Sequence, residues 1–596
     1  MLAPASQTSS LFSEEILKYH LDLLDTKAAQ NQGRILTDEA ALAPIIASSA
    51  LWRLQARDRD RKLLSASSRP DAAGEEDLVR GSPNPSAASS PSSSLQYGLL
   101  AGSRQEVHSI KKQLASATTA AGTSTSLLSP TYSSINLDTD PRLLFNVSTP
   151  SSTFICGSQG SGKSHTLSCL LESCLIPSKL GRLTKPLTGV VFHYDTFISD
   201  TGGTPCEAAY LASNKSLNVR VLCAPTNVAT IRASQRITWT RRTACRIADF
   251  EIYKRLNVSV EPLSIDQSDL NTKRMMDLMA VSAGDAPLYM ESVKRILREL
   301  RMVQQQVGGG FDYAEFRKRV KDCGLTAAQM GPLTQRLETL ESFMPDGQTN
   351  NYGCAKGKGG KGKGGKGKGG KAKKGKGKGG RGTDWTPSPG QLTIVDLSCP
   401  CVSPETACAL FNICLGIFLQ QDVDVGRVFA LDEAHKYMSA SPEAVVFTET
   451  ILSAVRLQRH LGVRAIVSTQ EPTISTALLN LCSVTIVHRF TSPEWLRVLR
   501  HHLAAAAEGI PGKTRAISAS GGGERSPGAE EDKEATLFDL IVKLKVGEAL
   551  LFAPSAIVGV CEEDGALVLE RLGGDYLAIK VRERLTEDGG RSVLSL

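Results

Sequence analysis

The feature that most constrains the fold of this chain is the run Gly157-Ser-Gln-Gly-Ser-Gly-Lys-Ser164, which matches G-x-x-x-x-G-K-[ST]. A short apolar run, residues 153–156, leads into it, and leucines at helical spacing follow it. Glycines in such a loop let backbone N–H groups surround phosphate oxygens, and the following helix points its positive end at them. The context therefore predicts a strand, a phosphate-binding loop and a helix in succession.

This loop predicts a nucleotide site that binds ATP and Mg²⁺. Lys163 is expected to reach the β- and γ-phosphates, and the Ser164 hydroxyl is expected to ligate Mg²⁺. A second Gly-Lys-Thr, at 512–514, has Ala507 in place of the first glycine and no strand before it, so it does not qualify. The predicted nucleotide contacts are Gly157, Ser158, Gln159, Gly160, Ser161, Gly162, Lys163, Ser164 and His165.

A second acidic element follows an apolar run at 427–431, which ends in Asp432 and Glu433. Asp432 is expected to hold Mg²⁺ through water, and Glu433 is expected to polarise the attacking water. The alternative is a buried strand followed by an acidic helix cap. Together with the upstream glycine loop, the two acids favour a nucleotide-hydrolysing site.

Two later runs end in polar residues that fit the same site. The run at 465–468 leads to Gln470, a candidate for touching both the γ-phosphate and the water. The next run, at 484–487, leads to Arg489, which is a candidate for stabilising charge on the transferring phosphoryl group. A surface salt bridge is the alternative role for Arg489, and Arg456 and Arg459 compete for the phosphate role.

Short β-branched runs alternate with helical ones along the chain, which favours a parallel α/β sheet covered on both faces. The predicted strands are 153–156, 190–194, 219–223, 392–397, 428–431, 465–468 and 484–487. The predicted division is a helical segment at 1–64, a disordered Ser/Pro/Ala-rich linker at 65–136, core at 137–228, a helical insertion at 229–350, a Lys/Gly loop at 351–390, core at 391–503, a flexible loop at 504–534 and completion of the core at 535–596. No strand is expected within 1–136.

The positive charge of the chain is concentrated in one place. Lys356 to Arg381 holds eleven lysines and one arginine with no acid, so removing these twelve charges from the net +8 leaves −4 elsewhere. Such a tract buries no core, and it either lies along nucleic-acid phosphates or is a loop that tolerates length. It lacks aromatic residues between the lysines, so it offers no base stacking.

The cysteines and the apolar runs point to an intracellular protein, with nucleus or cytoplasm left open. The 14 cysteines show no paired C-x-x-C spacing, which favours reduced, buried thiols. No secretory signal is recognisable at the start, and the longest apolar run, at 407–419, is too short to span a membrane. No membrane contact is expected.

The motifs resemble those of the HerA/FtsK superfamily of P-loop ATPases. The stretches that carry the resemblance are DEAHKY at 432–437, LGVRAIVSTQEPT at 461–473, HRF at 488–490, GQLTIVDLS at 390–398 and KVGEALLFAPSA at 545–556. The resemblance covers about 137–228 and 391–556, and the layout with its closing run at 582–590 also resembles P-loop proteins of fungi. It implies a RecA-like core of the additional-strand, catalytic-glutamate type.

What this resemblance implies about function is an ATPase that forms hexameric rings and pumps or unwinds double-stranded DNA. Three readings stay open. The first is an ATP-driven translocase or helicase-type motor. The second is a nucleotide switch or scaffold in which ATP orders the helical insertion for a protein partner, and the third is a packaging or mobile-element ATPase.

Overall fold

The computed structural model describes most of the predicted core and parts of both ends of the 596-residue chain. It describes residues 39–67, 95–120, 140–196, 205–228, 231, 258–279, 289–349, 381–421, 424–438, 440–503, 537–563 and 566–589. The predicted segment before 39, the Lys/Gly run at 356–380 and the predicted loop at 504–534 lie outside the described residues.

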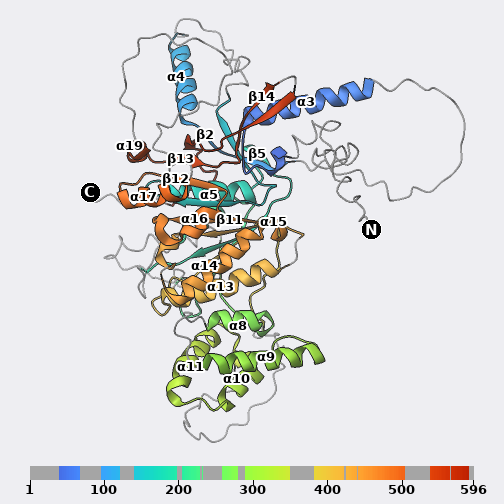
Figure 1. Cartoon of the computed structure of the whole chain (residues 1–596), viewed down its shortest axis with the longest axis vertical. Helices are drawn as coiled ribbons and strands as arrows, with labels where there is room; N and C mark the ends of the chain where they lie inside the picture. Colours follow the sequence, from blue (N-terminus) through green and yellow to red (C-terminus); the bar gives the residue numbers. More distant parts are fainter. Residues whose placement is uncertain are drawn as a thin grey trace, which may run out of the picture.

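The centre of the fold is a run of parallel strands within one mixed sheet (Figure 1). In spatial order its strands are β12 (Val484–Val487), β4 (Ser152–Cys156), β11 (Val463–Thr469), β10 (Arg427–Leu431), β6 (Thr188–His193), β9 (Gln391–Asp396), β7 (Asn218–Cys223) and β8 (Ser259–Pro262). Every residue of β4, β6, β10, β11 and β12 is buried, as expected for parallel strands with both faces covered. All seven predicted strands are present, and the predicted α/β class is confirmed.

Helices cover the two faces of this sheet, and side chains alternate between two apolar cores. Helix α5 (Lys163–Leu175) packs on one face, and α13 (Pro404–Gln420) and α14 (Pro442–Arg456) pack on the other. In β6, Val191 faces the α5 side while Val190 and Phe192 face the other. The period of two along each strand thus sends successive residues to opposite cores.

The helices on the far side of the sheet begin at a shared local signal. Helices α13, α14 and α17 (Pro493–His502) each start with proline after a serine whose hydroxyl accepts a backbone N–H of the first turn. Serine satisfies a donor that the helix cannot, and proline fits the first helical position because it lacks that N–H. The Ser-Pro pairs at 403–404, 441–442 and 492–493 therefore fix where these helices begin.

The sheet continues beyond β12 as an antiparallel half. Its strands, in spatial order, are β13 (Glu548–Phe552), β16 (Leu577–Val581), β2 (Tyr97–Ser103), β3 (Arg142–Asn146), β1 (Ile45–Ala47), β14 (Ile557–Glu563) and β15 (Ala566–Arg571), with β5 (Gly181–Arg182) beside β2. All neighbours pair antiparallel except β1 and β14, which are parallel. The two ends of the chain thus build this half together.

The expectation of no strand within 1–136, with a disordered linker at 65–136, is wrong for the part that the structure describes. Strand β1 lies before helix α3 (Ser48–Ser67), and β2 leads into helix α4 (Arg104–Ala120). β2 has the glycine-containing sequence YGLLAGS inside a Ser- and Ala-rich region, and it pairs with β16 more than 470 residues later. Strand formation here depends on distant partners, so local propensity does not reveal it.

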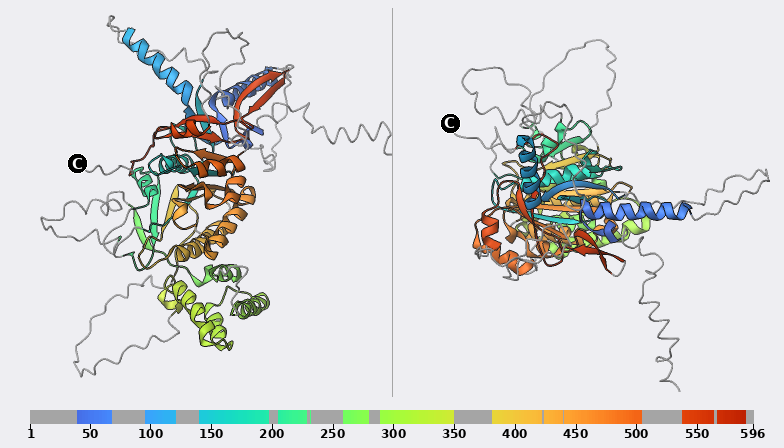
Figure 2. Two further views of the ribbon diagram at one scale, coloured as in Figure 1. Left: turned by 60° about the vertical axis from the view of Figure 1, so that its left-hand side comes forward. Right: turned by 90° about the horizontal axis from the view of Figure 1, so that it is seen from above.

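The insertion forms a helical lobe at the opposite end of the molecule from α3 and α4 (Figures 1 and 2). Its elements are η4 (Gln267–Asp269), α8 (Thr272–Leu278), α9 (Tyr289–Val307), α10 (Tyr313–Asp322), α11 (Ala327–Glu341) and α12 (Asp346–Thr349). An Arg336–Glu443 ion pair at 2.8 Å joins the lobe to α14. The insertion also contains β8, which the sequence did not predict and which extends the sheet parallel to β7.

The two ends of this lobe are tied together where the chain returns to the core. The backbone N–H of Gly382 donates to Asp266 Oδ2 at 3.0 Å, and that of Thr383 donates to the Ser264 carbonyl at 2.6 Å. Chain that leaves the sheet after β8 therefore re-enters it beside its point of departure. No helix in the described part of the chain is both long and apolar enough to cross a membrane.

Candidate nucleotide-binding site

The predicted phosphate loop joins the carboxyl end of β4 to α5. Gly157, Gly160 and Gly162 have φ of 151°, 70° and 111°, in the region that side-chain-bearing residues rarely adopt. A Cβ at Gly157 would lie 2.7 Å from the Cβ of His488. Two of these glycines are also crowded, since a Cβ at Gly162 would lie 3.1 Å from the Gly547 nitrogen. The loop geometry therefore requires glycine.

Lys163 crosses back over this loop. Its Nζ donates to the Ser158 carbonyl at 3.2 Å, and the residue is buried. Burial lowers the pKa of Lys163, and the carboxylates of Glu433 and Asp432 oppose that shift. The ammonium group thus lies near both acids, within a loop shaped to receive phosphate oxygens.

The two predicted acids follow β10. Asp432 is buried, its N–H donates to the Phe192 carbonyl at 3.0 Å, and its Oδ1 has no hydrogen-bond partner among the described residues. Glu433 has φ of 49°, which makes it the one residue other than glycine with positive φ in the described part of the chain. Backbone strain of this kind recurs at functional sites.

Strand β11 lies between β4 and β10, so Gln470 ends up between the phosphate loop and the acids. Its Nε2 donates to Gln159 Oε1 at 2.5 Å and to Glu433 Oε2 at 3.2 Å. The side chain thus bridges the loop and Glu433, and its predicted contact with the γ-phosphate and the water stays a prediction.

His435 is a neighbour of Glu433 that the sequence interpretation missed. Its Nδ1 lies 3.4 Å from Glu433 Oε2 and 3.4 Å from the Gln470 backbone nitrogen. Burial lowers the pKa of His435, while Glu433 opposes the shift. Its position three residues after Asp432 in the DEAH run was the available signal.

Arg489 reaches the loop through its backbone rather than its side chain. Its carbonyl accepts from Ser158 N at 2.9 Å and from Ser158 Oγ at 2.8 Å, while the residue is exposed. Arg459 lines a cavity with Ser151, which directly precedes β4. It therefore lies at the amino ends of the strands, opposite the loop within the same chain.

A buried histidine, His488, links the first turn of α5 to the start of β13. His488 Nε2 is 2.9 Å from Thr166 Oγ1, and its Nδ1 is 3.1 Å from the Glu548 carbonyl. Burial lowers the pKa of His488 to about 3, so the ring is neutral at physiological pH. The sequence interpretation singled out the exposed Arg489 and missed this buried neighbour.

Two further predicted contacts, His165 and Ser161, differ in their hydrogen bonds, and two residues that were not predicted lie beside Asp432. His165, on the first turn of α5, places Nε2 2.7 Å from the Arg582 carbonyl, so its ring faces the C-terminal residues. Ser161 Oγ is buried without a hydrogen-bond partner among the described residues. His193 Nδ1 lies 3.5 Å from Asp432 Oδ2, and the Cys206 thiol lies 3.9 Å from the same oxygen.

The residues present fit Mg²⁺ and a nucleotide phosphate. A hydroxyl from Ser164 and a buried carboxylate with a spare oxygen from Asp432 are oxygen ligands of the kind that Mg²⁺ takes. The phosphate loop supplies backbone donors at glycines, and at Gly157 a Cβ would lie only 2.7 Å from the Cβ of His488. Most of the twelve described cysteines are buried.

No protein-family model matches the chain, and no curated protein matches it in sequence. Among solved structures it is similar to VirB4 of Thermoanaerobacter pseudethanolicus, at 11% identity and a TM-score of 0.38, over 73% of this chain and 89% of that one. The bacterial conjugative coupling protein TrwB gives 12% identity and a TM-score of 0.30, over 74% of this chain and 89% of that one.

A third solved structure is the genome packaging NTPase B204 of Sulfolobus turreted icosahedral virus 2 in complex with AMP. It gives 14% identity and a TM-score of 0.18, over 31% of this chain and 68% of that one. These likenesses are partial, and the nucleotide site rests on the residues of this chain. In this chain the predicted loop, the two acids and Gln470 follow three neighbouring parallel strands, β4, β10 and β11.

Proposed function

We propose that this chain binds ATP with Mg²⁺ and hydrolyses it. The observation that carries the proposal is the hydrogen-bonded row Gln159–Gln470–Glu433, with links of 2.5 and 3.2 Å. Its three members come from the carboxyl ends of the neighbouring strands β4, β11 and β10. The phosphate loop, Gln470 and Glu433 therefore meet where a terminal phosphate would lie.

Each of these residues has a role that follows from its chemistry. Lys163 and the loop N–H groups bind the phosphate oxygens, and Ser164 and Asp432 would hold Mg²⁺. Bound Mg²⁺ would supply charge neutralisation for the β- and γ-phosphates. Glu433 accepts a proton from the attacking water, and Gln470 orients that water through its contact with Glu433.

The first test is ATP turnover and ATP binding by the purified full-length protein. Lys163→Ala is expected to abolish binding or hydrolysis, because the loop loses its one ammonium group near the phosphates. Lys185→Ala, an exposed lysine in the segment between α5 and β6, is the matched control. Normal turnover in Lys163→Ala would refute the assignment of this loop as the ATP site.

The finer proposal is that hydrolysis drives movement on double-stranded DNA, in a ring of subunits. It rests on the superfamily resemblance and on the charge of the Lys356–Arg381 tract. Turnover should rise with double-stranded DNA and fall as salt increases. Deleting 356–381 should remove the stimulation while leaving basal turnover in place, and unchanged stimulation would exclude the tract as a DNA contact.

Oligomer number is tested by mass measurement in solution with and without a slowly hydrolysed ATP analogue. A six-subunit mass would support the ring, and a monomer under both conditions would refute it. A packaging or mobile-element ATPase would give the same DNA stimulation and differ in its partner. DNA stimulation alone therefore does not separate these two readings.

A switch or scaffold is the second candidate, and one surface of the insertion favours it. On α9, Met302, Val303 and Val307 are 56%, 46% and 80% exposed. Apolar side chains gathered on one exposed helix end are suited to a protein partner. ATP turnover indifferent to DNA would favour this reading, and DNA-stimulated turnover would disfavour it.

A further inference from the structure

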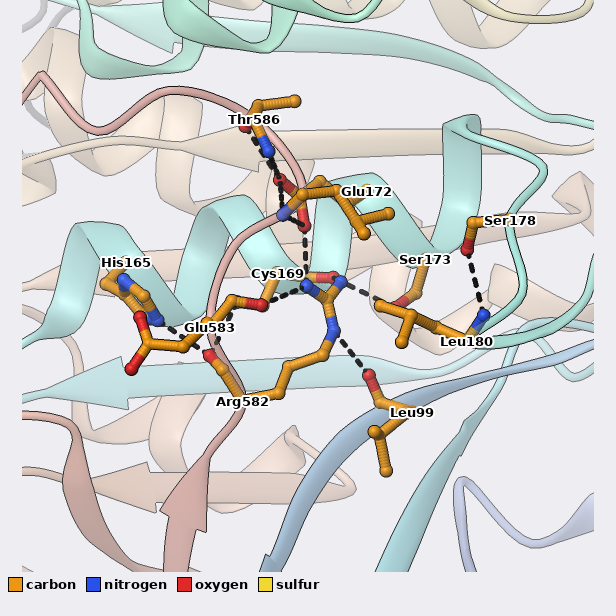
Figure 3. Close-up of polar contacts among 11 residues, drawn as sticks. Leu99, His165, Cys169, Glu172, Ser173, Ser178, Leu180, Arg582, Glu583 and Thr586 are labelled. Carbon is orange, nitrogen blue, oxygen red and sulfur yellow. Dashed lines mark hydrogen bonds and ion pairs between the residues drawn. The ribbon is translucent and has the colours of Figure 1, made fainter. Parts of the chain in front are cut away.

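The C-terminal strap, residues 582–589, runs from β16 along the phosphate-loop helix α5 (Figure 3). Arg582 donates to Glu172 Oε2 at 2.6 Å, to the Cys169 carbonyl at 3.0 Å and to the Leu99 carbonyl at 2.6 Å. Glu172 is fully buried and also accepts from the hydroxyl of Thr586 at 2.7 Å. These contacts fasten the strap to α5.

Two residues further on, the strap reaches the short helix η2 (Glu207–Ser213). Arg584 Nη1 donates to Glu207 Oε1 at 2.7 Å, and Glu587 N donates to Ser213 Oγ at 3.0 Å. The Arg584 side chain is only 2% exposed, and its Nε and Nη2 have no hydrogen-bond partner among the described residues. A buried guanidinium with two spare donors is costly unless something else meets them.

Glu207 lies on the side of the nucleotide site where Mg²⁺ would bind. Helix η2, which begins at Glu207, packs against the phosphate-loop helix α5. The adjacent Cys206 places its thiol 3.9 Å from Asp432 Oδ2, which brings this turn against the second magnesium group. Burial raises the pKa of Glu207, and Arg584 opposes that shift, so the arginine favours the ionised carboxylate.

We propose that Glu207 accepts a hydrogen bond from a water molecule on the nucleotide-bound Mg²⁺, and that Arg584 is the positioning residue that holds Glu207 there. This inference rests on the proposed function, since it concerns the same Mg²⁺. Magnesium keeps several of its waters when it binds beside phosphates, and outer-shell carboxylates orient such waters.

A purely structural role for Arg584 would repeat what Arg582 already does. The guanidinium of Arg582 has all of its nitrogens hydrogen-bonded, and its partner Glu172 is buried away from the loop. Arg584 differs because its carboxylate partner directly follows Cys206, whose thiol lies 3.9 Å from Asp432 Oδ2, and because its own donors are incompletely used. Buried donors left without a protein acceptor mark a place for water, an ion or a ligand.

The test is binding of a fluorescent ATP analogue by the full-length protein during a Mg²⁺ titration. Glu207→Gln and Arg584→Gln should each raise the Mg²⁺ concentration at half-maximal binding by about tenfold, because an outer-shell partner is lost. For Arg584→Lys, the Mg²⁺ concentration at half-maximal binding should lie between the values for these variants and for wild type. The double variant should shift no further than the single ones, because both act through one carboxylate.

Arg582→Lys is the matched control, because it loosens the strap at Glu172 and leaves Glu207 and Arg584 in place. A merely structural role would lower the unfolding temperature in all variants and leave the Mg²⁺ dependence unchanged. Two results would overturn this inference without touching the proposed function. One is a wild-type Mg²⁺ requirement in Glu207→Gln, and the other is a shift in Arg582→Lys as large as that in Glu207→Gln. Failure of the wild-type protein to bind the analogue at any Mg²⁺ concentration would overturn the proposed function with it.

Discussion

The parallel and antiparallel halves of the sheet are built in opposite ways. In the parallel half, strands such as β4 and β10 each lead directly into a polar turn that carries the chemistry. In the antiparallel half, β2 and β16 come from opposite ends of the chain and carry none of the predicted site residues. The parallel half holds the residues of the proposed site, and the antiparallel half pairs with it along β12.

The antiparallel half nevertheless reaches the phosphate loop. Gly547 N, just before β13, donates to the Ser161 carbonyl at 3.4 Å, and the Glu548 carbonyl holds His488. The strap that follows β16 also binds α5, through Arg582 and Glu172. The residues of the proposed site therefore belong to the parallel half, whereas both halves hold them in position.

The largest expected effect comes from the parallel half alone. Glu433→Gln should lower ATP turnover by about 10²–10⁴-fold, because the attacking water loses its base. Binding of ATP should persist, since the loop and Lys163 are unchanged. The measurement is steady-state phosphate release beside an ATP-binding titration, and a variant that hydrolyses ATP at the normal rate would remove Glu433 from the mechanism.

The ion pair between Arg582 of the strap and Glu172 of α5 should make a large contribution to the free energy of unfolding. Glu172→Gln should lower the free energy of unfolding by about 3–5 kcal/mol, because Arg582 becomes a buried charge without its carboxylate. Urea unfolding of the full chain measures this loss. Adding Arg582→Gln to Glu172→Gln should recover part of it, and a loss below about 1 kcal/mol would show that the strap is not tightly coupled to α5.

A pH effect should follow from His488, which the two halves bury together. Its pKa is about 3 in the folded chain against 6.5 ordinarily, so the unfolded chain takes up a proton first as pH falls. The contribution of His488 to the free energy of unfolding is therefore complete above pH 6.5. It decreases by about 1.4 kcal/mol per pH unit as pH falls toward 3. Unfolding of His488→Asn across this range should show a shallower acid slope, and an identical slope would contradict the assignment.

The smallest effect is expected at the outer edge of the antiparallel half. Glu39 and Arg571 pair at 3.3 Å, but their side chains are 48% and 47% exposed. Glu39→Gln should lower the free energy of unfolding by less than about 1 kcal/mol, since water and salt screen such pairs. Urea unfolding of Glu39→Gln and Glu172→Gln in parallel compares the two losses in free energy of unfolding. Equal losses would contradict the expected difference between the exposed and the buried ion pair.

The sequence predicted the parallel half well because its signals are local. Apolar runs such as 428–431 gave the strands, and the spacing from Gly157 to Ser164 gave the loop. The adjacency of Gln470 and Glu433 was also predictable, because the carboxyl ends of parallel strands meet at one edge of a sheet. The Ser-Pro pairs at the starts of α13, α14 and α17 are a local signal of the same kind, although the sequence analysis did not use it.

The rest depended on partners far away in the chain. β1 and β2 have short, weakly patterned sequences and become strands only beside β3, β14 and β16. Glu207 and Arg584 are ordinary charged residues in the sequence, and nothing local marks them as neighbours. Their pairing needs a strap and a turn separated by 377 residues to meet over one helix.

Periodicity and glycine spacing are properties of neighbouring residues, so the sequence was enough to predict the phosphate loop, the acids after β10 and the parallel strands that carry them. Three features could be learned only from the folded chain: strands from both ends of the sequence complete the sheet, His488 is buried and neutral beside the loop, and Arg584 lies next to Glu207. Burial and ion pairing depend on which distant segments pack together, and that is settled when the whole core forms.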